Sequence, residues 1–251
     1  MQEWWLMVIV FGMVFVVAGL IVWAILKTTA PAGVLQVERY RKPTRILHWV
    51  HGGAFVILFL TGLILFLPPL AFLAEDSWSR VLHRVAAVLF IVAPLIYMPL
   101  NWKTSVRGIK DAFTWGKDDI GWLQAAPRYY FLCDEDVMPP QEHMNTGQKM
   151  WWFMVIVFGV VFAITGLIIW FAKTTAPPAL LQWMIFIHDI AFIATGLMLF
   201  VHIYMSVVHP LVRPLRTGAW NSMFRGKVSV DYAKSHHGKW YEEVSKGVKE
   251  G

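Results

Sequence analysis

Among the nine histidines in this sequence, His48, His83, His188 and His202 lie within or at the ends of long apolar stretches. Ionisable groups are costly inside a membrane, and there they usually mark functional sites. His188 and His202 share one stretch, fourteen residues apart, which is close to four helical turns and about 21 Å along the axis. This spacing predicts two sites at different depths rather than one.

The imidazole rings could bind a metal in two ways. Two imidazoles can ligate a haem iron from opposite faces of the porphyrin. Zinc is the alternative, but its sites usually include Cys or carboxylate ligands and hold all ligands close together. A histidine taken alone could also be an ordinary amphipathic group at the membrane surface. The choice depends on the helices that carry the four rings.

The composition is that of a membrane protein, with 57% hydrophobic and 15% charged residues, whereas soluble domains have roughly 45 to 50% and about 25%. Apolar blocks of near 20 residues, the length that crosses a bilayer, are candidate spans. There are five: Trp4 to Leu26, Ile46 to Leu67, Val81 to Leu100, Met150 to Phe171 and Trp183 to Val208.

Basic residues indicate the orientation of the spans. They gather before the second span, in the loop from Lys103 to Lys149 and in the tail after His209, so these regions are predicted to be cytoplasmic. The connections Pro68 to Ser79 and Thr174 to Gln182 are then external. The net charge of +6 is explained by these flanks, and we expect no nucleic-acid binding.

This topology pairs the histidines by depth. His48 opens the second span on the inner side, near the depth of His202. His83 opens the third span on the outer side, near His188. A bundle of four helices supplies the apolar slot that a porphyrin needs. The sequence therefore predicts two stacked b haems, one held by His48 with His202 and one by His83 with His188.

The first span is an apparent copy of the fourth. The segment WWLMVIVFGMVFVVAGLIVW from Trp4 resembles WWFMVIVFGVVFAITGLIIW from Trp151. A removable signal peptide is the alternative, but its first residues should be basic, and this chain begins Met1, Gln2, Glu3. We expect an uncleaved extra helix. Its orientation and role stay open, because strict alternation makes the two copies point in opposite directions.

We therefore expect an all-α integral membrane fold, a four-helix dihaem cytochrome b bundle plus one extra N-terminal transmembrane helix. The predicted parts are residues 1–38, the extra helix and a linker; 39–209, the bundle with its long cytoplasmic loop 101–149; and 210–251, a cytoplasmic basic tail. Cys133 is the only cysteine, so this chain alone can build neither an intrachain disulfide nor a cysteine-ligated iron-sulfur cluster. It also lacks a Rossmann glycine pattern and a molybdopterin motif.

Three arginines lie close in sequence to the candidate ligands: Arg45, Arg80 and Arg84. A guanidinium group pairs well with carboxylates, so they could bind haem propionates. Topology signals or contacts with lipid head groups explain them equally well. Three further histidines, His209, His236 and His237, fall at the inner end or in the tail, and we expect them to be solvent-exposed.

Several segments resemble the cytochrome b, or gamma, subunit of respiratory membrane-bound formate dehydrogenase over about residues 38 to 245. Four of them carry the candidate ligands: TRILHW from Thr44, RVLHRV from Arg80, FIHDIAF around His188 and LFVHIYM around His202. The inner loop and tail add GWLQAAPRYYFL, MPPQ, NTGQK and GKVSVDYAKSHHGKWYEE. The resemblance implies the same haem pairs as the depths of the histidines.

The resemblance also implies a quinone pocket beside the inner haem, formed by Asn145, Gly147 and Gln148 with His202, for menaquinone or ubiquinone. Asn and Gln can hydrogen-bond a quinone carbonyl. The alternative is a plain helix N-cap at Asn145 or Thr146. The neighbouring His143 could relay protons or be a solvated loop residue.

The implied partners are an iron-sulfur (beta) subunit and, through it, a molybdenum or tungsten catalytic (alpha) subunit, in a higher oligomer in the bacterial cytoplasmic membrane. The chain would carry no substrate-oxidising site of its own but would be the quinone-reducing subunit. Electrons would pass from the partner to the outer haem, the inner haem and quinone. Alternatives are the cytochrome b subunit of a hydrogenase or another molybdoenzyme and, in a different class, a haem-free membrane anchor or transporter.

Overall fold

The structure is a computed structural model of all 251 residues, and it describes residues 19, 34–132, 134, 137–209 and 219–249. The predicted extra N-terminal helix and Cys133 lie outside these residues. Contacts divide the chain into two compact units. One unit comprises residues 42–119 and 144–201, and the other comprises residues 1–41, 120–143 and 202–251.

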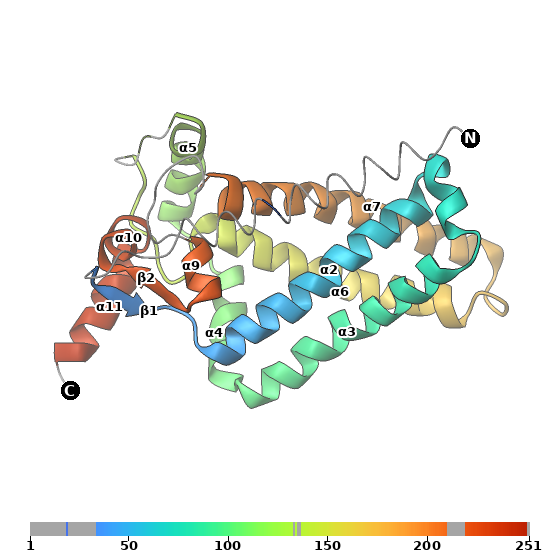
Figure 1. Ribbon diagram of the computed structural model, residues 1–251, viewed down its shortest axis with the longest axis horizontal. Helices are drawn as coiled ribbons and strands as arrows, with labels where there is room; N and C mark the ends of the chain where they lie inside the picture. Colours follow the sequence, from blue (N-terminus) through green and yellow to red (C-terminus); the bar gives the residue numbers. More distant parts are fainter. Residues whose placement is uncertain (1–18, 20–33, 133, 135–136, 210–218, 250–251) are drawn as a thin grey trace. The chain divides into compact units, whose positions relative to one another are not determined.

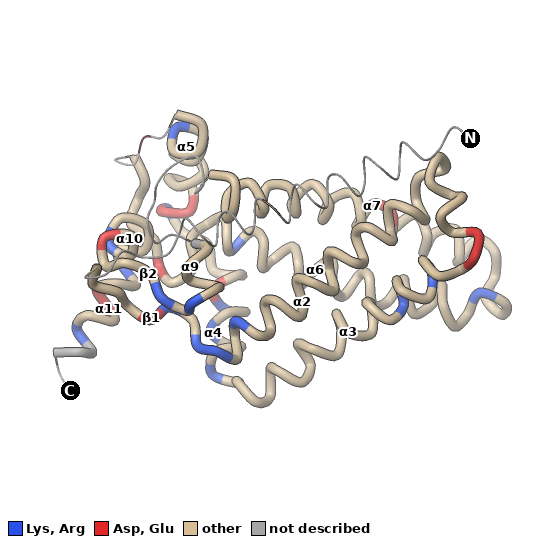
Figure 2. Tube along the Cα trace, in the orientation of Figure 1, with Lys and Arg blue, Asp and Glu red and all other residues tan. Residues whose placement is uncertain are grey.

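Four long apolar helices dominate the first unit (Figure 1): α2 (Lys42–Phe66), α3 (Trp78–Leu100), α6 (Thr146–Phe171) and α7 (Pro178–Ile203). They have 23 to 26 residues each, so each is roughly 35 to 39 Å long and can cross a hydrocarbon core of about 30 Å. In Figure 2 the charged residues lie mostly near the ends of these helices, although α7 carries Asp189 near its middle. The prediction of an all-α membrane fold with these four spans is confirmed, and the chain is a multi-pass membrane protein.

Most apolar side chains on the four helices face outward. Val85, Leu95 and Leu197, for example, are each about 60% exposed. In water such surface would be strongly unfavourable, whereas lipid tails are as apolar as these side chains. The contacts between helices accordingly use small residues and aromatic rings.

Two glycines let α2 and α7 approach closely. A Cβ on Gly196 of α7 would lie 2.7 Å from the Phe59 ring of α2, and one on Gly62 of α2 would lie 3.0 Å from the Phe192 ring of α7. The two phenylalanine rings also stack, with centroids 5.4 Å apart. Each helix therefore places a ring over a glycine of the other.

Short segments join the spans. The 3-10 helix η1 (Pro68–Ala74) connects α2 to α3, and Ser77 takes the left-handed conformation, with φ 63°, just before α3 begins. After α3, Asn101 ends that helix and starts α4 (Trp102–Phe113), which packs against α6 through the rings of Phe113 and Phe153. The helix α5 (Lys117–Leu132) follows.

The second unit holds a small folded module. The strands β1 (Gln36–Glu38) and β2 (Lys227–Ser229) pair antiparallel, with Val37 opposite Val228. The remaining elements are α9 (Ala219–Phe224), α10 (Val230–His236) and α11 (Gly238–Lys249), and the π-helical turn η2 (Tyr204–Val208) that follows α7. Val228, Ala233 and Trp240 form its buried apolar cluster. The predicted basic tail is therefore folded over residues 219–249.

Candidate haem site

His83 of α3 and His188 of α7 bring their rings close together in the first unit. Their ring centroids are 6.4 Å apart, with the rings inclined at 51°. Metal–imidazole bonds of about 2.0 to 2.1 Å, with about 1.1 Å from each nitrogen to its ring centre, place two opposed imidazole centroids roughly 6.3 Å apart. The observed separation therefore fits one metal held between the two rings.

The Nδ1 nitrogen of each ring is within hydrogen-bond distance of a threonine hydroxyl. Thr61 Oγ1 of α2 lies 2.8 Å from His83 Nδ1, and Thr165 Oγ1 of α6 lies 2.8 Å from His188 Nδ1. A hydroxyl has one hydrogen, and each threonine also lies 2.7 Å from a backbone carbonyl four residues earlier that can accept it. Each Nδ1–H then donates to the threonine, which leaves Nε2 of both rings as the nitrogen with a lone pair for iron.

The arrangement does not suit zinc. The structure holds no group of three or more His, Cys, Asp or Glu side chains placed to bind a metal, within the described part of the chain. A tetrahedral site needs such a group, whereas a haem iron takes its four equatorial bonds from the porphyrin and needs only two axial ligands from the protein. The donor set of His83 and His188 thus fits haem b.

Two candidate propionate partners, Arg80 and Arg84, make protein contacts near the start of α3. Arg80 donates a hydrogen bond from Nη1 to the Ala74 carbonyl at 2.7 Å. The Arg84 guanidinium lies over the Trp170 ring of α6, 5.3 Å from its centroid. Arg45 lies in the first turn of α2. Pairing of these arginines with propionates stays a prediction.

The members of the other predicted pair belong to different units. His48 lies in the second turn of α2 with its ring edge-on to Trp49, at a centroid distance of 5.0 Å. His202 is near the end of α7, directly before the π-helical turn η2. Such turns occur often at functional sites. Their pairing stays a prediction.

Sequence reasoning gave no role to His51, which is one turn after His48. Its ring stacks on Phe90 of α3, with centroids 3.9 Å apart and planes inclined at 19°. The ring is therefore already packed in the contact between α2 and α3. This makes His51 a natural control for His48.

Asn145 and Gln148 form a capping box at the start of α6. Asn145 Oδ1 accepts a hydrogen bond from the Gln148 amide nitrogen at 2.9 Å, and Gln148 Oε1 accepts one from the Asn145 amide nitrogen at 3.1 Å. The N-cap alternative is therefore observed. The capping box uses the side-chain oxygens of Asn145 and Gln148, whereas a quinone carbonyl would accept a hydrogen bond from their NH₂ groups. The cap is therefore compatible with the predicted quinone role of Asn145, Gly147 and Gln148.

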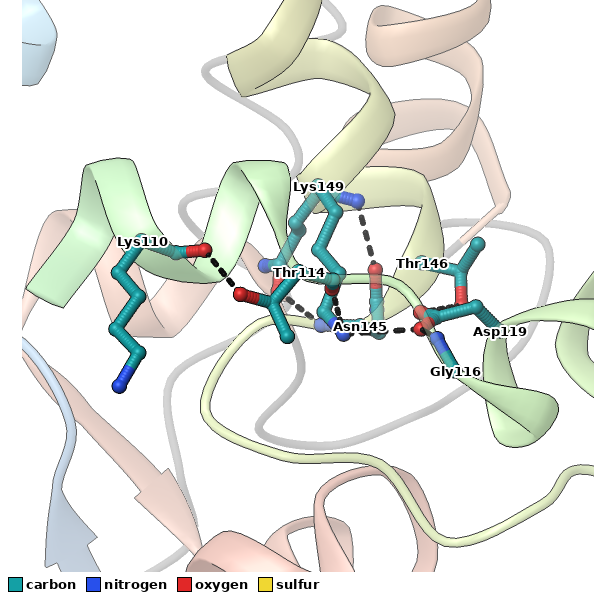
Figure 3. Close-up of polar contacts among 8 residues, drawn as sticks. Lys110, Thr114, Gly116, Asp119, Asn145, Thr146 and Lys149 are labelled. Atoms are coloured by element: carbon teal, nitrogen blue, oxygen red, sulfur yellow. Dashed lines mark hydrogen bonds and ion pairs between the residues drawn. The ribbon is translucent and has the colours of Figure 1, made fainter.

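A buried ion pair anchors the same helix end (Figure 3). Lys149 Nζ lies 3.1 Å from Asp119 Oδ2, and both side chains are only 6% exposed. Thr146 donates to Asp119 Oδ1 at 2.8 Å, and the Gly116 amide donates to Oδ2 at 2.8 Å. Burial by itself raises the pKa of Asp119, but the hydrogen bonds from Thr146, Gly116 and Lys149 and the charge of Lys149 outweigh it, so the pKa is lowered.

The prediction that the late histidines are solvent-exposed is wrong for His209 and His237, which are 4% and 0% exposed. His237 Nδ1 lies 2.8 Å from the Glu142 carbonyl, and Arg39 Nη2 lies 3.4 Å from the same nitrogen. Burial, followed by the charge of Arg39, holds the pKa of His237 well below its usual value. The sequence prediction failed because contacts distant in sequence bury these rings: His237 contacts Glu142, 95 residues earlier, and His209 packs against Tyr129 and Tyr130.

His236 and His143 are partly buried as well. His236 Nε2 lies 2.6 Å from the Tyr129 hydroxyl. The backbone carbonyl of His143 accepts a hydrogen bond from Arg39 at 2.6 Å, and its ring packs edge-on to Tyr40 and Trp240. His143 is therefore a structural part of the module rather than a solvated loop residue, and its predicted alternative as a proton relay is untested.

Comparison with known proteins places the chain in a family. The model of the family described as prokaryotic cytochrome b561 matches residues 39–226. The chain belongs to this family. Membership of the cytochrome b561 family implies that the chain binds haem b, and the pair of His83 and His188 is a suitable place for it.

Curated relatives of this cytochrome b561 family member are subunits of formate dehydrogenases. The cytochrome b556(fdo) subunit of formate dehydrogenase from Escherichia coli K12 is 27% identical over 217 residues, covering 84% of this chain and 94% of the relative. The cytochrome b556(Fdn) subunit of the nitrate-inducible enzyme from the same organism is 28% identical over 224 residues, covering 84% and 93%. The cytochrome b556 subunit from Haemophilus influenzae is 28% identical over 219 residues, covering 83% of each. These matches confirm the resemblance, at modest identity.

Proposed function

We propose that the chain is the membrane cytochrome b subunit of a formate dehydrogenase, holding two b haems and passing electrons from an iron-sulfur partner subunit to membrane quinone. The observation that carries this proposal is the proximity of the His83 and His188 rings, with centroids 6.4 Å apart and each Nδ1 held by a threonine. The choice of formate dehydrogenase as the enzyme rests on the names of the relatives.

The first haem would lie between His83 and His188. Haem b supplies a one-electron carrier whose iron needs two axial nitrogens. The protein supplies those nitrogens from α3 and α7, sets their tautomers through Thr61 and Thr165, and surrounds them with the apolar side chains of four helices. The long exposed apolar faces of these helices support a site inside a bilayer.

The second haem would lie between His48 and His202, with the quinone pocket beside it at Asn145, Gly147 and Gln148. Support comes from position along the helices. His202 is fourteen residues beyond His188 on α7, which is about 21 Å along the axis. The capping box fixes the backbone from Asn145 to Gln148, and the ion pair of Asp119 with Lys149 anchors the same end of α6.

Electrons would enter at the outer haem from the partner's iron-sulfur subunit, which in turn serves a molybdenum or tungsten subunit. They would leave at the inner haem to menaquinone or ubiquinone, with protons taken from the cytoplasm. Moving an electron inward against a negative interior costs up to about 2.3 kcal/mol per 100 mV. The complex, a higher oligomer in the bacterial inner membrane, would thus store formate's reducing power as membrane potential.

The proposal is tested by removing one ligand at a time from the intact complex. We would record dithionite-reduced minus oxidised spectra of wild type, His83→Ala, His188→Ala, His48→Ala and His202→Ala, with His51→Ala as the matched control on α2. We expect each ligand variant to lose one haem or destabilise both, and His51→Ala to keep two. Equal loss in the control and the ligand variants would contradict the ligand assignment.

Quinone reduction needs its own readout. We would follow formate-dependent reduction of a water-soluble menaquinone analogue by the complex, and compare wild type with Asn145→Asp. Aspartate keeps a cap acceptor but removes the NH₂ donor. We expect a raised KM for the quinone with the haems still reduced by formate. An unchanged KM would contradict the assignment of Asn145 to the quinone pocket. A wild-type complex without haem would instead favour the alternative function of a membrane anchor or transporter.

A further inference from the structure

The same short motif occurs on three of the spans, and among the described residues two of its copies hydrogen-bond a histidine. Thr61-Gly62-Leu63 lies on α2, Thr165-Gly166-Leu167 on α6 and Thr195-Gly196-Leu197 on α7. Each threonine is buried, at 2%, 3% and 4% exposure. Each hydroxyl also lies 2.7 to 2.8 Å from the carbonyl four residues earlier. The three side chains therefore have the same local bonding.

The threonines of α2 and α6 form an additional contact. Thr61 holds His83 of the following span, 22 residues later, and Thr165 holds His188 of the following span, 23 residues later. Each oxygen–nitrogen distance is 2.8 Å. The hydrogen bonds described for Thr195, in contrast, go to the carbonyls of Ala191 and Phe192. Two equivalent threonines thus serve the two ligands of one site, from the two helices that carry neither ligand.

The N-terminal copy of the α6 sequence has a different residue at the threonine position. Aligning Trp4 with Trp151 places Ala18 opposite Thr165, while Gly19 and Leu20 match Gly166 and Leu167. Alanine has no hydroxyl, so this copy of the sequence cannot hold an imidazole in the same way. The threonine is therefore not a general requirement of this apolar segment.

We propose that Thr61 and Thr165 are positioning residues that fix the tautomers of His83 and His188 and set the reduction potential of the haem they hold. The proposal rests on the proposed function, because it takes these histidines as the axial ligands. It goes further by assigning the residues that control the electron affinity of the site.

The chemistry follows from the direction of the hydrogen bond. An Nδ1–H that donates to an acceptor makes the imidazole a better electron donor through Nε2, and such partners orient the ring and tune the metal. Stronger donation stabilises ferric iron more than ferrous iron. A neutral hydroxyl that already donates to a carbonyl is a modest acceptor, weaker than a carboxylate. Removing it should therefore raise the reduction potential.

Valine is the discriminating substitution, because it keeps the branched shape of threonine and lacks the hydroxyl. Thr61→Val and Thr165→Val each leave one Nδ1–H without its acceptor, whereas Thr61→Ser and Thr165→Ser keep the hydroxyl. Thr195→Val is the matched control, with the same motif, burial and carbonyl bond but no histidine contact described. All five variants are prepared in the intact complex with its haems.

The measurement is a redox titration of each haem followed by its absorption, with electron paramagnetic resonance of the ferric state to report ring orientation. We expect the valine variants to shift the potential of one haem upward, by up to about tenfold in the ferrous-to-ferric ratio, or about 59 mV for a one-electron couple. The serine variants and Thr195→Val should keep the wild-type potential and spectrum.

Each outcome decides the proposal. An unchanged potential in both valine variants that retain haem would overturn it, as would an equal shift in Thr195→Val or loss of haem in serine and valine variants alike. Loss of the haem in the valine variants alone would support the positioning role, since the hydroxyl would then be needed to hold the ligand. A wild-type complex without haem at His83 and His188 would contradict the proposed function instead.

Discussion

Replacing Asp119 with asparagine removes one charge from the buried pair at the start of α6 and leaves the Lys149 ammonium group without its counter-ion. Both side chains are 6% exposed, so solvent screens the pair little. Breaking one partner of a buried ion pair typically costs about 3 to 5 kcal/mol. Asparagine can still accept a hydrogen bond from Thr146 or Gly116, so we expect a loss of stability at the lower end of this range, about 3 kcal/mol. Asp118→Asn, one residue earlier and partly exposed, should lower stability by less than Asp119→Asn does.

The assay is unfolding of the detergent-purified complex in denaturant, followed by the helical circular dichroism signal, in a double-mutant cycle. The variants are Asp119→Asn, Lys149→Met and the double substitution. Because the double variant leaves neither charge unpaired, its loss should be smaller than the sum of the single losses by at least about 1 kcal/mol. Additive losses, or a loss for Asp119→Asn no larger than for Asp118→Asn, would refute the argument that this pair anchors α6.

Three other outcomes follow from particular contacts. Because burial lowers the pKa of His237, the unfolded module takes up a proton that the folded one does not. Its stability should fall as pH drops below about 6.5, by up to about 1.4 kcal/mol per pH unit, and hydrogen exchange over residues 219–249 should show this in wild type but far less in His237→Asn. The lowered pKa of Asp119 gives stability that is present above about pH 4 and is lost as pH falls through the folded pKa; an acid unfolding midpoint identical in wild type and Asp119→Asn would contradict this. Gly196→Ala should lower the thermal midpoint, because its Cβ would lie 2.7 Å from the Phe59 ring, whereas Gly53→Ala, with nothing within 4 Å, should not.

The spans could be predicted from the sequence because a membrane demands long runs of apolar residues, and these runs are visible without knowledge of any contact. Helix ends were less well defined. The observed α2 begins at Lys42 rather than Ile46, and α6 at Thr146 rather than Met150. Polar residues at the membrane surface extend a helix without adding to its apolar run.

The proximity of His83 and His188 could be expected from the depth of each residue in its predicted span, because alternating helices fix which ends meet. The threonine contacts could not, since they depend on the rotation of α2 and α6 about their axes. A signal was nevertheless present in the repeated Thr-Gly-Leu motif, whose N-terminal counterpart carries Ala18.

The burial of His237 and the bond from Arg39 to His143 were also beyond sequence reasoning. These contacts join residues 104 and 198 positions apart, and neither segment has the apolar periodicity that predicts a core. Basic composition favoured a solvated tail. The structure instead folds it around Val228, Ala233 and Trp240.

The central claim, that this cytochrome b561 family member holds two haems between paired histidines, is tested most directly by counting haem per chain. We would purify the wild-type complex, determine haem b by the pyridine haemochrome method and determine the chain by quantitative amino-acid analysis. The account predicts two haems b per chain. One haem per chain would contradict the second pair of His48 and His202, and none would contradict the account as a whole.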